Sequence, residues 1–141
     1  MISSAPMSEP DRIEVEARSY ELDPYGHVNN AVFVNWLEHG RLCYLRERGM
    51  TWASLPDQFG VRALIVRMEI DWRAEVNLGD RLTIESGITK FGNRSFTFGQ
   101  RILFPDDRIA AEAVAVMVVT GPDGGSTPIP DGLRERLSTR L

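Results

Sequence analysis

The sequence predicts an α+β protein in which an antiparallel sheet curls around one long helix. Two observations lead to this class. A strand-like segment precedes a single long helical segment of mostly apolar residues, and four more strand-like segments follow it. A helix of about 19 residues is about 28 Å long, close to the width of five or six strands at about 4.8 Å each, so it can lie across the whole sheet.

The composition of the 141-residue chain limits what it can bind. Its net charge of -4 argues against nucleic acid as a partner. One cysteine, Cys43, and two histidines, His27 and His39, are too few for a disulfide or a structural zinc site, and no motif indicates a cofactor. Because neither a signal peptide nor a membrane-spanning run is found, we expect a cytoplasmic protein without membrane contact. Residues 1–10 are predicted to be a disordered tail and residues 11–141 a single domain.

The first two elements differ in their hydrophobic period. Residues 13–20 alternate, with Ile13, Val15 and Ala17 between charged neighbours, which is typical of a half-buried strand. From residue 30 to about residue 48 the apolar residues follow helical spacing and cover more than half of the circumference. We therefore expect this helix to be mostly buried, with strands on more than one side of it.

Four strands and a short helix complete the chain. The clearest strand runs over residues 61–76, where apolar and charged residues alternate with a period of two. Turn residues separate the later segments, which predicts that consecutive strands are antiparallel neighbours. The three later strands are predicted over residues 81–89, 95–104 and 109–120. Residues 130–141 are predicted to be a terminal helix, and the glycine-rich run before it, which lacks the GK[ST] ending of a phosphate loop, is interpreted as a plain turn.

The segment between the first strand and the long helix, ELDPYGHVNNA at residues 21–31, gathers an acid, an imidazole and two amides. A structural interpretation accounts for each of them singly. The letters DPYG, starting at Asp23, match a type I turn position by position, with Asp first, Pro second and Gly fourth. Asn29 or Asn30 is suited to cap the N-terminus of the helix.

Together the same residues indicate a site for acyl chemistry. The N-terminus of a helix presents unpaired N–H groups and a positive dipole end, which suits the carbonyl oxygen of a reacting ester. A carboxylate and an imidazole a few residues earlier can lie beside that carbonyl. The chain has no GxSxG motif, and Cys43 lacks an evident base partner, so no serine or cysteine nucleophile is indicated. The candidate chemistry is a carboxylate, Asp23, that activates water or attacks directly.

The run DPYGHVNNAVFVNWLEHGR resembles the signature of the hotdog-fold acyl-CoA thioesterases of the 4-hydroxybenzoyl-CoA thioesterase family, in which Asp-x-x-Gly-His-Val-Asn-Asn precedes the central helix. The segments IDWRAEVNLGDRLTI and KFGNRSFTFGQRI are also similar to that family, and the resemblance covers about residues 12–137. It implies the hotdog fold, an antiparallel five-stranded sheet wrapped around a long central helix. It also implies hydrolysis of a thioester to a free acid and CoA.

The resemblance assigns roles to residues of this motif. Asp23 takes the position of the family's catalytic aspartate, as general base or nucleophile. The backbone N–H of Asn30 takes that of the amide that polarises the thioester carbonyl. His27 is given an orienting role, and Asn29 is expected to contact the substrate.

An acidic protein that binds CoA must still offer positive charge to its phosphates. The turn that contains Lys90, Arg94 and Ser95 is the best candidate, by resemblance and by chemistry, and a solvated hairpin turn is the alternative interpretation. Two positions depart from the family's pattern. Phe33 stands where many members have Tyr, and Asn93 adds one residue between Gly and Arg, which leaves the acyl preference open.

Glu38 is a reserve candidate for the catalytic carboxylate, because another hotdog branch uses a helix glutamate, although an i,i+3 ion pair with Arg41 is the favoured interpretation. Hotdog relatives pair into dimers with a continuous sheet, so we expect a homodimer or homotetramer acting on acyl-CoA or acyl-carrier-protein thioesters. Two alternatives stay open. One is a non-catalytic acyl-thioester or lipid-binding hotdog module, which has no need of Asp23, and the other is a subunit that serves only assembly.

Overall fold

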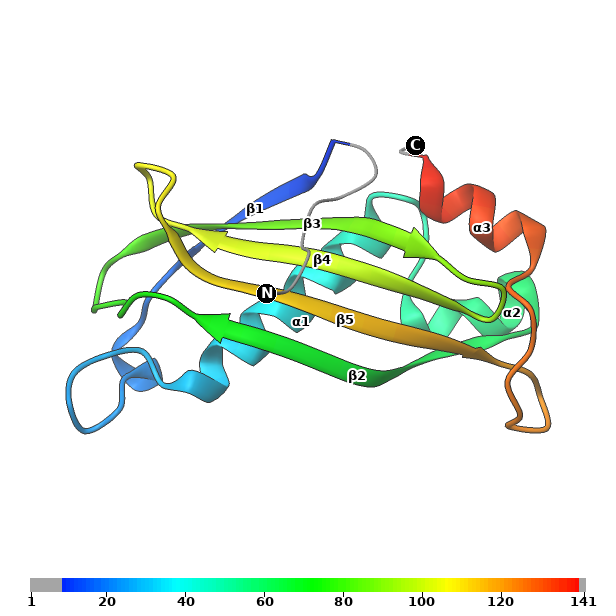
Figure 1. Ribbon diagram of the computed structural model, residues 1–141, viewed down its shortest axis with the longest axis horizontal. Helices are drawn as coiled ribbons and strands as arrows, with labels where there is room; N and C mark the ends of the chain where they lie inside the picture. The colour runs from blue at the N-terminus through cyan, green and yellow to red at the C-terminus, as the bar shows by residue number, and fades with distance from the viewer. Residues whose placement is uncertain (1–8, 140–141) are drawn as a thin grey trace.

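The computed structural model describes residues 9–139 (Figure 1). Residues 1–8 of the predicted tail and the last two residues of the predicted terminal helix lie outside this range. The elements, in chain order, are β1 (Asp11–Glu16), a 3-10 turn (Ser19–Glu21), α1 (Asn30–Arg46), a second 3-10 turn (Trp52–Ser54), α2 (Leu55–Phe59), β2 (Arg62–Trp72), β3 (Arg81–Phe91), β4 (Ser95–Leu103), β5 (Ile109–Thr120) and α3 (Asp131–Ser138). None of the described helices is long and apolar enough to cross a lipid bilayer.

The five strands form one antiparallel sheet in the order β1-β3-β4-β5-β2, and α1 runs diagonally across one face of it (Figure 1). This confirms the predicted α+β class and the sheet around a central helix. The prediction that all consecutive strands are neighbours is wrong for β2 and β3. The segment between them crosses from one side of the sheet to the other. At its start the Arg73 N–H donates to the Ala110 carbonyl on β5, and at its end the Asp80 carbonyl accepts from the Ala17 N–H beside β1.

Several predicted boundaries also change. The first strand ends at Glu16 rather than at residue 20, since the chain then turns into the 3-10 turn. The loop after α1 contains α2, which was not predicted. In β2 a bulge between Ile65 and Arg67 breaks the predicted period of two, and Leu64 and Val66, which strict alternation places on the apolar face, are exposed.

The core under α1 consists of two apolar clusters. One surrounds Phe33 and Leu37 in the first half of the helix, and the other surrounds Tyr44 and Leu45 in the second half. Between them lies a polar layer, which we define as Arg41, Ser86 and Gln100; all three side chains are buried. The core is therefore apolar at both ends of the helix and polar at its middle.

The polar layer holds α1 directly on β3 and β4. The Gln100 carboxamide donates from Nε2 to the Leu37 carbonyl at 2.8 Å and to Ser86 Oγ at 2.9 Å. Gly40 lies over these groups, and a Cβ atom there would come within 2.7 Å of Ser86 Oγ. A side chain at this position would push the helix away from the sheet. The glycine and the hydrogen bonds together hold the middle of the helix close to β3 and β4.

A buried ion pair joins the other end of α1 to the edge strand β1. The Arg48 guanidinium donates to both carboxylate oxygens of Asp11, at 2.8 and 3.2 Å, and to the Tyr44 carbonyl at 2.9 Å. It also stacks on the Tyr44 ring, 3.4 Å from the centroid. Since both charged side chains are buried, Asp11 supplies the counter-charge that the Arg48 guanidinium needs.

Replacing Asp11 with Asn should destabilise the protein strongly, because it keeps the shape but leaves the Arg48 charge buried without a counter-charge. We expect a loss of about 3 kcal/mol in the free energy of unfolding, measured by urea denaturation. Glu9→Gln is the matched control: it breaks the exposed Glu9–Arg12 pair and should change the free energy by less than about 1 kcal/mol. Equal effects of the two substitutions would contradict this account.

Candidate active site

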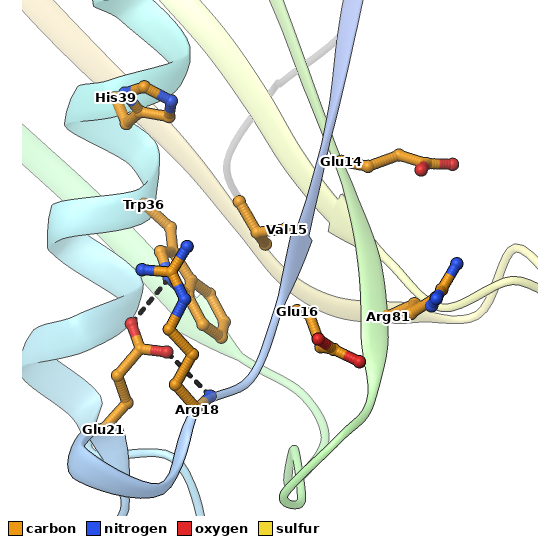
Figure 2. A pocket seen from close by; sticks show the side chains of 8 residues that line it. All are labelled: Glu14, Val15, Glu16, Arg18, Glu21, Trp36, His39 and Arg81. Carbon is orange, nitrogen blue, oxygen red and sulfur yellow. Dashed lines mark hydrogen bonds between the residues drawn. The ribbon is translucent and has the colours of Figure 1, made fainter.

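The loop before α1 is anchored at both ends through Glu21. Its carboxylate accepts from the Arg18 backbone N–H at 2.9 Å and from the Trp36 indole N–H at 3.1 Å (Figure 2). Its carbonyl accepts from the Asn29 N–H at 2.9 Å. The start and the end of the loop are thereby tied to each other and to the second turn of the helix.

Within this loop the predicted turn forms as expected. The Gly26 N–H donates to the Asp23 carbonyl at 3.0 Å, and Gly26 takes a positive φ of 85°. The Asp23 carboxylate accepts through Oδ1 from two backbone groups, the Tyr25 N–H at 2.8 Å and the His27 N–H at 3.1 Å. These bonds orient the carboxylate, and its second oxygen, Oδ2, accepts no hydrogen bond from any group in residues 9–139.

The N-terminus of α1 is capped by Asn29 rather than by Asn30. The Asn29 side chain accepts from the Ala31 N–H at 2.9 Å, and its carbonyl accepts from the Val32 N–H at 2.9 Å. The backbone N–H of Asn30 has no acceptor among the described residues. One free donor therefore remains at the positive end of the helix dipole.

Asp23 and Asn30, the residues that carry the free carboxylate oxygen and the free N–H, line one cleft. It has a volume of about 320 Å³ and is lined by Asp23, His27, Val28, Asn30, Phe33 and residues 72–75. His27 and Asn77 form a β-bridge, and the Val28 N–H donates to the Val76 carbonyl at 2.8 Å. The crossover after β2 thus forms one wall of the cleft, the predicted residues Asp23, His27 and Asn30 form another, and Phe33 and Trp72 make part of it apolar.

Asn29 does not line this cleft, because its side chain is used as the helix cap. Glu38 does not line it either: it lies exposed further along α1, and no ion pair joins it to Arg41 in the described structure. The favoured i,i+3 pair was therefore wrong. Arg41 turns inward to Gln100 while Glu38 faces solvent.

The turn with Lys90, Arg94 and Ser95 lies at the opposite end of the sheet from this cleft, beside α3 (Figure 1). The 17 residues of α1 that separate the two ends span about 25 Å. Arg94 also has partners of its own, since its Nη1 donates to the Ser126 carbonyl at 2.6 Å. A single chain does not bring this turn to the cleft.

Sequence reasoning missed the residues that the crossover contributes. His27 Nε2 lies 3.2 Å from a carboxylate oxygen of Glu75, and Trp72 is half exposed at the mouth of the cleft. The only signal in the sequence was the similarity of the segment IDWRAEVNLGD to the thioesterase family. No cluster of three or more potential metal ligands occurs within the described part of the chain.

Known proteins match this chain in both sequence and structure. The sequence profile of the Thioesterase-like superfamily matches residues 17–137. The long-chain acyl-CoA thioesterase FadM of Escherichia coli (strain K12) is 30% identical over 107 residues, which is 74% of this chain and 79% of FadM. The acyl-acyl carrier protein thioesterase ATL3, chloroplastic, of Arabidopsis thaliana is 27% identical over 131 residues, 92% of this chain and 68% of ATL3.

The fold has equally clear counterparts. The crystal structure of a 4-hydroxybenzoyl-CoA thioesterase variant in complex with 4-hydroxybenzoyl-CoA superposes with a TM-score of 0.82 at 19% identity, over 92% of this chain and 99% of that one. This similarity establishes the hotdog fold. With the family match over residues 17–137, it shows that the chain belongs to the Thioesterase-like superfamily of hotdog-fold proteins, whose members named above are acyl-CoA and acyl-carrier-protein thioesterases.

Proposed function

We propose that this protein hydrolyses acyl thioesters of CoA or of acyl carrier protein, and that Asp23 and the Asn30 N–H are the reacting groups. The observation that carries the proposal is that one cleft is lined both by Asp23, which has a carboxylate oxygen without a hydrogen-bond donor, and by Asn30, which has a helix N-terminal N–H without an acceptor among the described residues. The named relatives act on both kinds of thioester, which supports this substrate class.

The chemistry follows from these two groups. The thioester carbonyl oxygen accepts from the Asn30 N–H, where the helix dipole stabilises the negative charge that develops on that oxygen. As general base, Asp23 takes a proton from water while the water oxygen adds to the carbonyl carbon. The C–S bond then breaks, and the thiolate receives the proton from Asp23, which regenerates the carboxylate.

Direct attack is the second route open to Asp23. The carboxylate oxygen would add to the carbonyl carbon, the C–S bond would break, and the resulting anhydride would be cleaved by water. His27 serves either route as a positioning residue. Its backbone N–H donates to Asp23 and its ring is held beside Glu75, so it links the loop to the crossover.

The alternative of a non-catalytic binding module has one observation in its favour. The Asp23 carboxylate accepts two backbone N–H groups, so a purely structural role for this residue is physically sufficient. The two functions differ in what they require of the charge. Hydrolysis needs a base or nucleophile, whereas the turn needs only an acceptor oxygen.

The structure also supports a dimer. β2 lies at the edge of the sheet, where its outer N–H and C=O groups have no strand partner among the described residues. This strand exposes apolar side chains, namely those of Leu64, Ile65, Val66 and Trp72. We propose that β2 pairs with β2 of a second copy, which covers the exposed apolar residues and borders the cleft at Trp72.

Since Lys90 and Arg94 do not reach the cleft of their own chain, any contact they make with CoA phosphates is assigned to the cleft of a second copy.

Asp23→Asn separates the two roles of this residue, because the amide keeps the acceptor oxygen but removes the charge. We expect the fold to survive and kcat to fall by about 100-fold or more, measured by release of free thiol from a panel of acyl-CoAs. Glu38→Gln, on an exposed carboxylate outside the cleft, is the control and should retain most of the activity. Near-normal turnover of Asp23→Asn with an inactive Glu38→Gln would move the catalytic carboxylate to Glu38. Binding without hydrolysis by the unaltered protein would establish the binding module instead.

The dimer is tested by placing a charge on the β2 edge. The unaltered protein should sediment at about twice 15.9 kDa or more at micromolar concentration, and Ile65→Lys should shift it toward the monomer, because a lysine on an edge strand opposes pairing. Leu78→Lys, at an exposed apolar residue outside the strands, is the control and should leave the mass unchanged. A 15.9 kDa species alone would disprove the proposed dimer.

If Lys90 and Arg94 bind the CoA phosphates, removing either side chain should change KM and leave kcat nearly unchanged. Lys90→Ala and Arg94→Ala should each raise KM for acyl-CoA about fivefold with little change in kcat, as expected when an exposed charge contact worth about 1 kcal/mol is lost. Arg81→Ala, at the opposite end of β3, is the control. If KM is the same for all three variants and the unaltered protein, the phosphates are bound elsewhere.

A further inference from the structure

Arg41 carries a buried charge that forms no ion pair in the described structure. Its side chain lies in the polar layer with 5% exposure, and its one hydrogen bond runs from Nη1 to the neutral carbonyl oxygen of Gln100 at 2.9 Å. Burial lowers the pKa of the guanidinium, and the more distant Glu38 carboxylate raises it by a smaller amount. An arginine nevertheless keeps its proton at neutral pH. The site therefore holds a positive charge and lacks an anion.

The Nε and Nη2 edge of the Arg41 guanidinium is the edge through which arginine side chains bind carboxylates. Nε and Nη2 of Arg41 bond to no group in residues 9–139. Elsewhere in the same protein, Arg12 and Arg101 each bind Glu85 through this Nε and Nη2 edge, at 2.6 to 2.9 Å. Among the described side chains, Arg48 Nε is the one fully buried polar atom that has no hydrogen-bond partner. Nε and Nη2 of Arg41 must therefore still be reached by solvent.

Helix geometry places this edge in line with the candidate active site. Arg41 follows Asn30 by 11 residues, which is within about 20° of three full turns and about 16 Å along the axis. Trp36 and Cys43 line pockets with β1, and Gly40 lies over β3 and β4. Arg41 follows Gly40 on the side of the helix away from Trp36 and Cys43, which in the strand order is the side of β5 and β2, and its hydrogen-bond partner Gln100 lies on β4 next to β5.

The surface between these two positions is apolar and only partly covered. On α1 it carries Val34, which is half buried, one turn after Asn30. On the sheet, the row that contains Gln100 continues through Ala113 to Ile70, and Met68 and Ile70 are half buried against the core. Ala113 is fully buried, and its small side chain lies in this row beside Gln100, the hydrogen-bond partner of Arg41. An extended acyl chain held by its carbonyl at Asn30 would follow this surface and end at the guanidinium.

We propose that Arg41 is a second recognition point for the substrate, which binds a carboxylate at the far end of the acyl group. The inference rests on the proposed thioester hydrolysis and specifies its substrate class: thioesters of acyl groups that end in a carboxylate, with a chain long enough to run from Asn30 to Arg41, whose backbone positions are about 16 Å apart along the helix axis. The carboxylate would take the free Nε and Nη2 edge in a bidentate contact and supply the missing counter-charge. Stability alone gives no reason for the charge, since an apolar side chain of similar volume would fill the site without desolvation.

The test compares matched pairs of acyl-CoAs of equal chain length, one ending in a carboxylate and the other in a methyl group. Free-thiol release gives kcat/KM for each. At the chain length that reaches Arg41, the carboxylate-terminated member should be preferred about tenfold or more, as expected for a charge-assisted hydrogen bond in a buried site. Arg41→Met should abolish this preference, while Arg46→Met, at an exposed arginine on the same helix, should keep it. Arg41→Lys, which retains the charge but not the bidentate edge, should keep part of it.

Several outcomes would overturn the proposal. If the unaltered protein hydrolyses the carboxylate-terminated and the methyl-terminated acyl-CoA equally at every chain length, Arg41 does not bind the end of the acyl group, although the thioesterase function stands. If Arg41→Met weakens the dimer but leaves the preference unchanged, the counter-charge is a carboxylate of a second copy. If no thioester is hydrolysed at all, the proposed function fails, and the dissociation constants of the same pairs decide whether Arg41 binds a carboxylate. Should Arg41→Met not fold, the unaltered protein and Arg41→Lys still supply the comparison.

Discussion

The close contact of α1 with the sheet at Gly40 determines where the rest of the structure can lie. Gln100 bonds the helix backbone at Leu37, and the absence of a side chain at residue 40 lets this amide and Ser86 fit beneath the helix. Because the helix is held at one height and one register, its first turn must end beside the crossover that follows β2. The candidate cleft is formed at that meeting point, with one wall from the loop before the helix and the other from the crossover. A shift of the helix along the sheet would separate the two walls.

In the loop before α1, the bonds that hold the backbone also determine which polar atoms remain free. Asp23 uses one carboxylate oxygen to hold the backbone of its own turn, and Asn29 uses its side chain to cap the second helical N–H. Each of these local bonds decides which neighbouring atom stays free. The atoms left over are the second oxygen of Asp23 and the N–H of Asn30, and both residues line the same cleft. The same local bonds therefore hold the loop in place and leave unpaired the two groups that the proposed hydrolysis would use.

What could be predicted from the sequence was what depends on near neighbours along the chain. The turn at Asp23, the start of α1 and strand β5 follow from caps, turn residues and hydrophobic period, and they were placed correctly. The pairing of β2 with β5, the bulge after Ile65 and the crossover depend on contacts between residues far apart in sequence, which a local pattern does not encode. For the same reason Glu75 was missed as a neighbour of His27. The i,i+3 spacing predicted a Glu38–Arg41 ion pair, but this local pattern does not show that Arg41 is buried and bonds Gln100, which is far away in the sequence.

Arg41 on α1 and Arg48 just after its C-terminal end are both buried, but only one of them forms an ion pair within the described structure. Arg48 meets a carboxylate of its own chain through two hydrogen bonds and stacks on an aromatic ring, so its charge is compensated within the described structure. Arg41 meets a neutral amide and keeps its bidentate edge free. Desolvation disfavours both charges, yet the fold supplies a counter-charge for one alone. This asymmetry is not required for packing, since the apolar clusters on both sides of the polar layer are filled. It is accounted for if the anion that completes the site of Arg41 arrives with a molecule that binds along the same face of the helix.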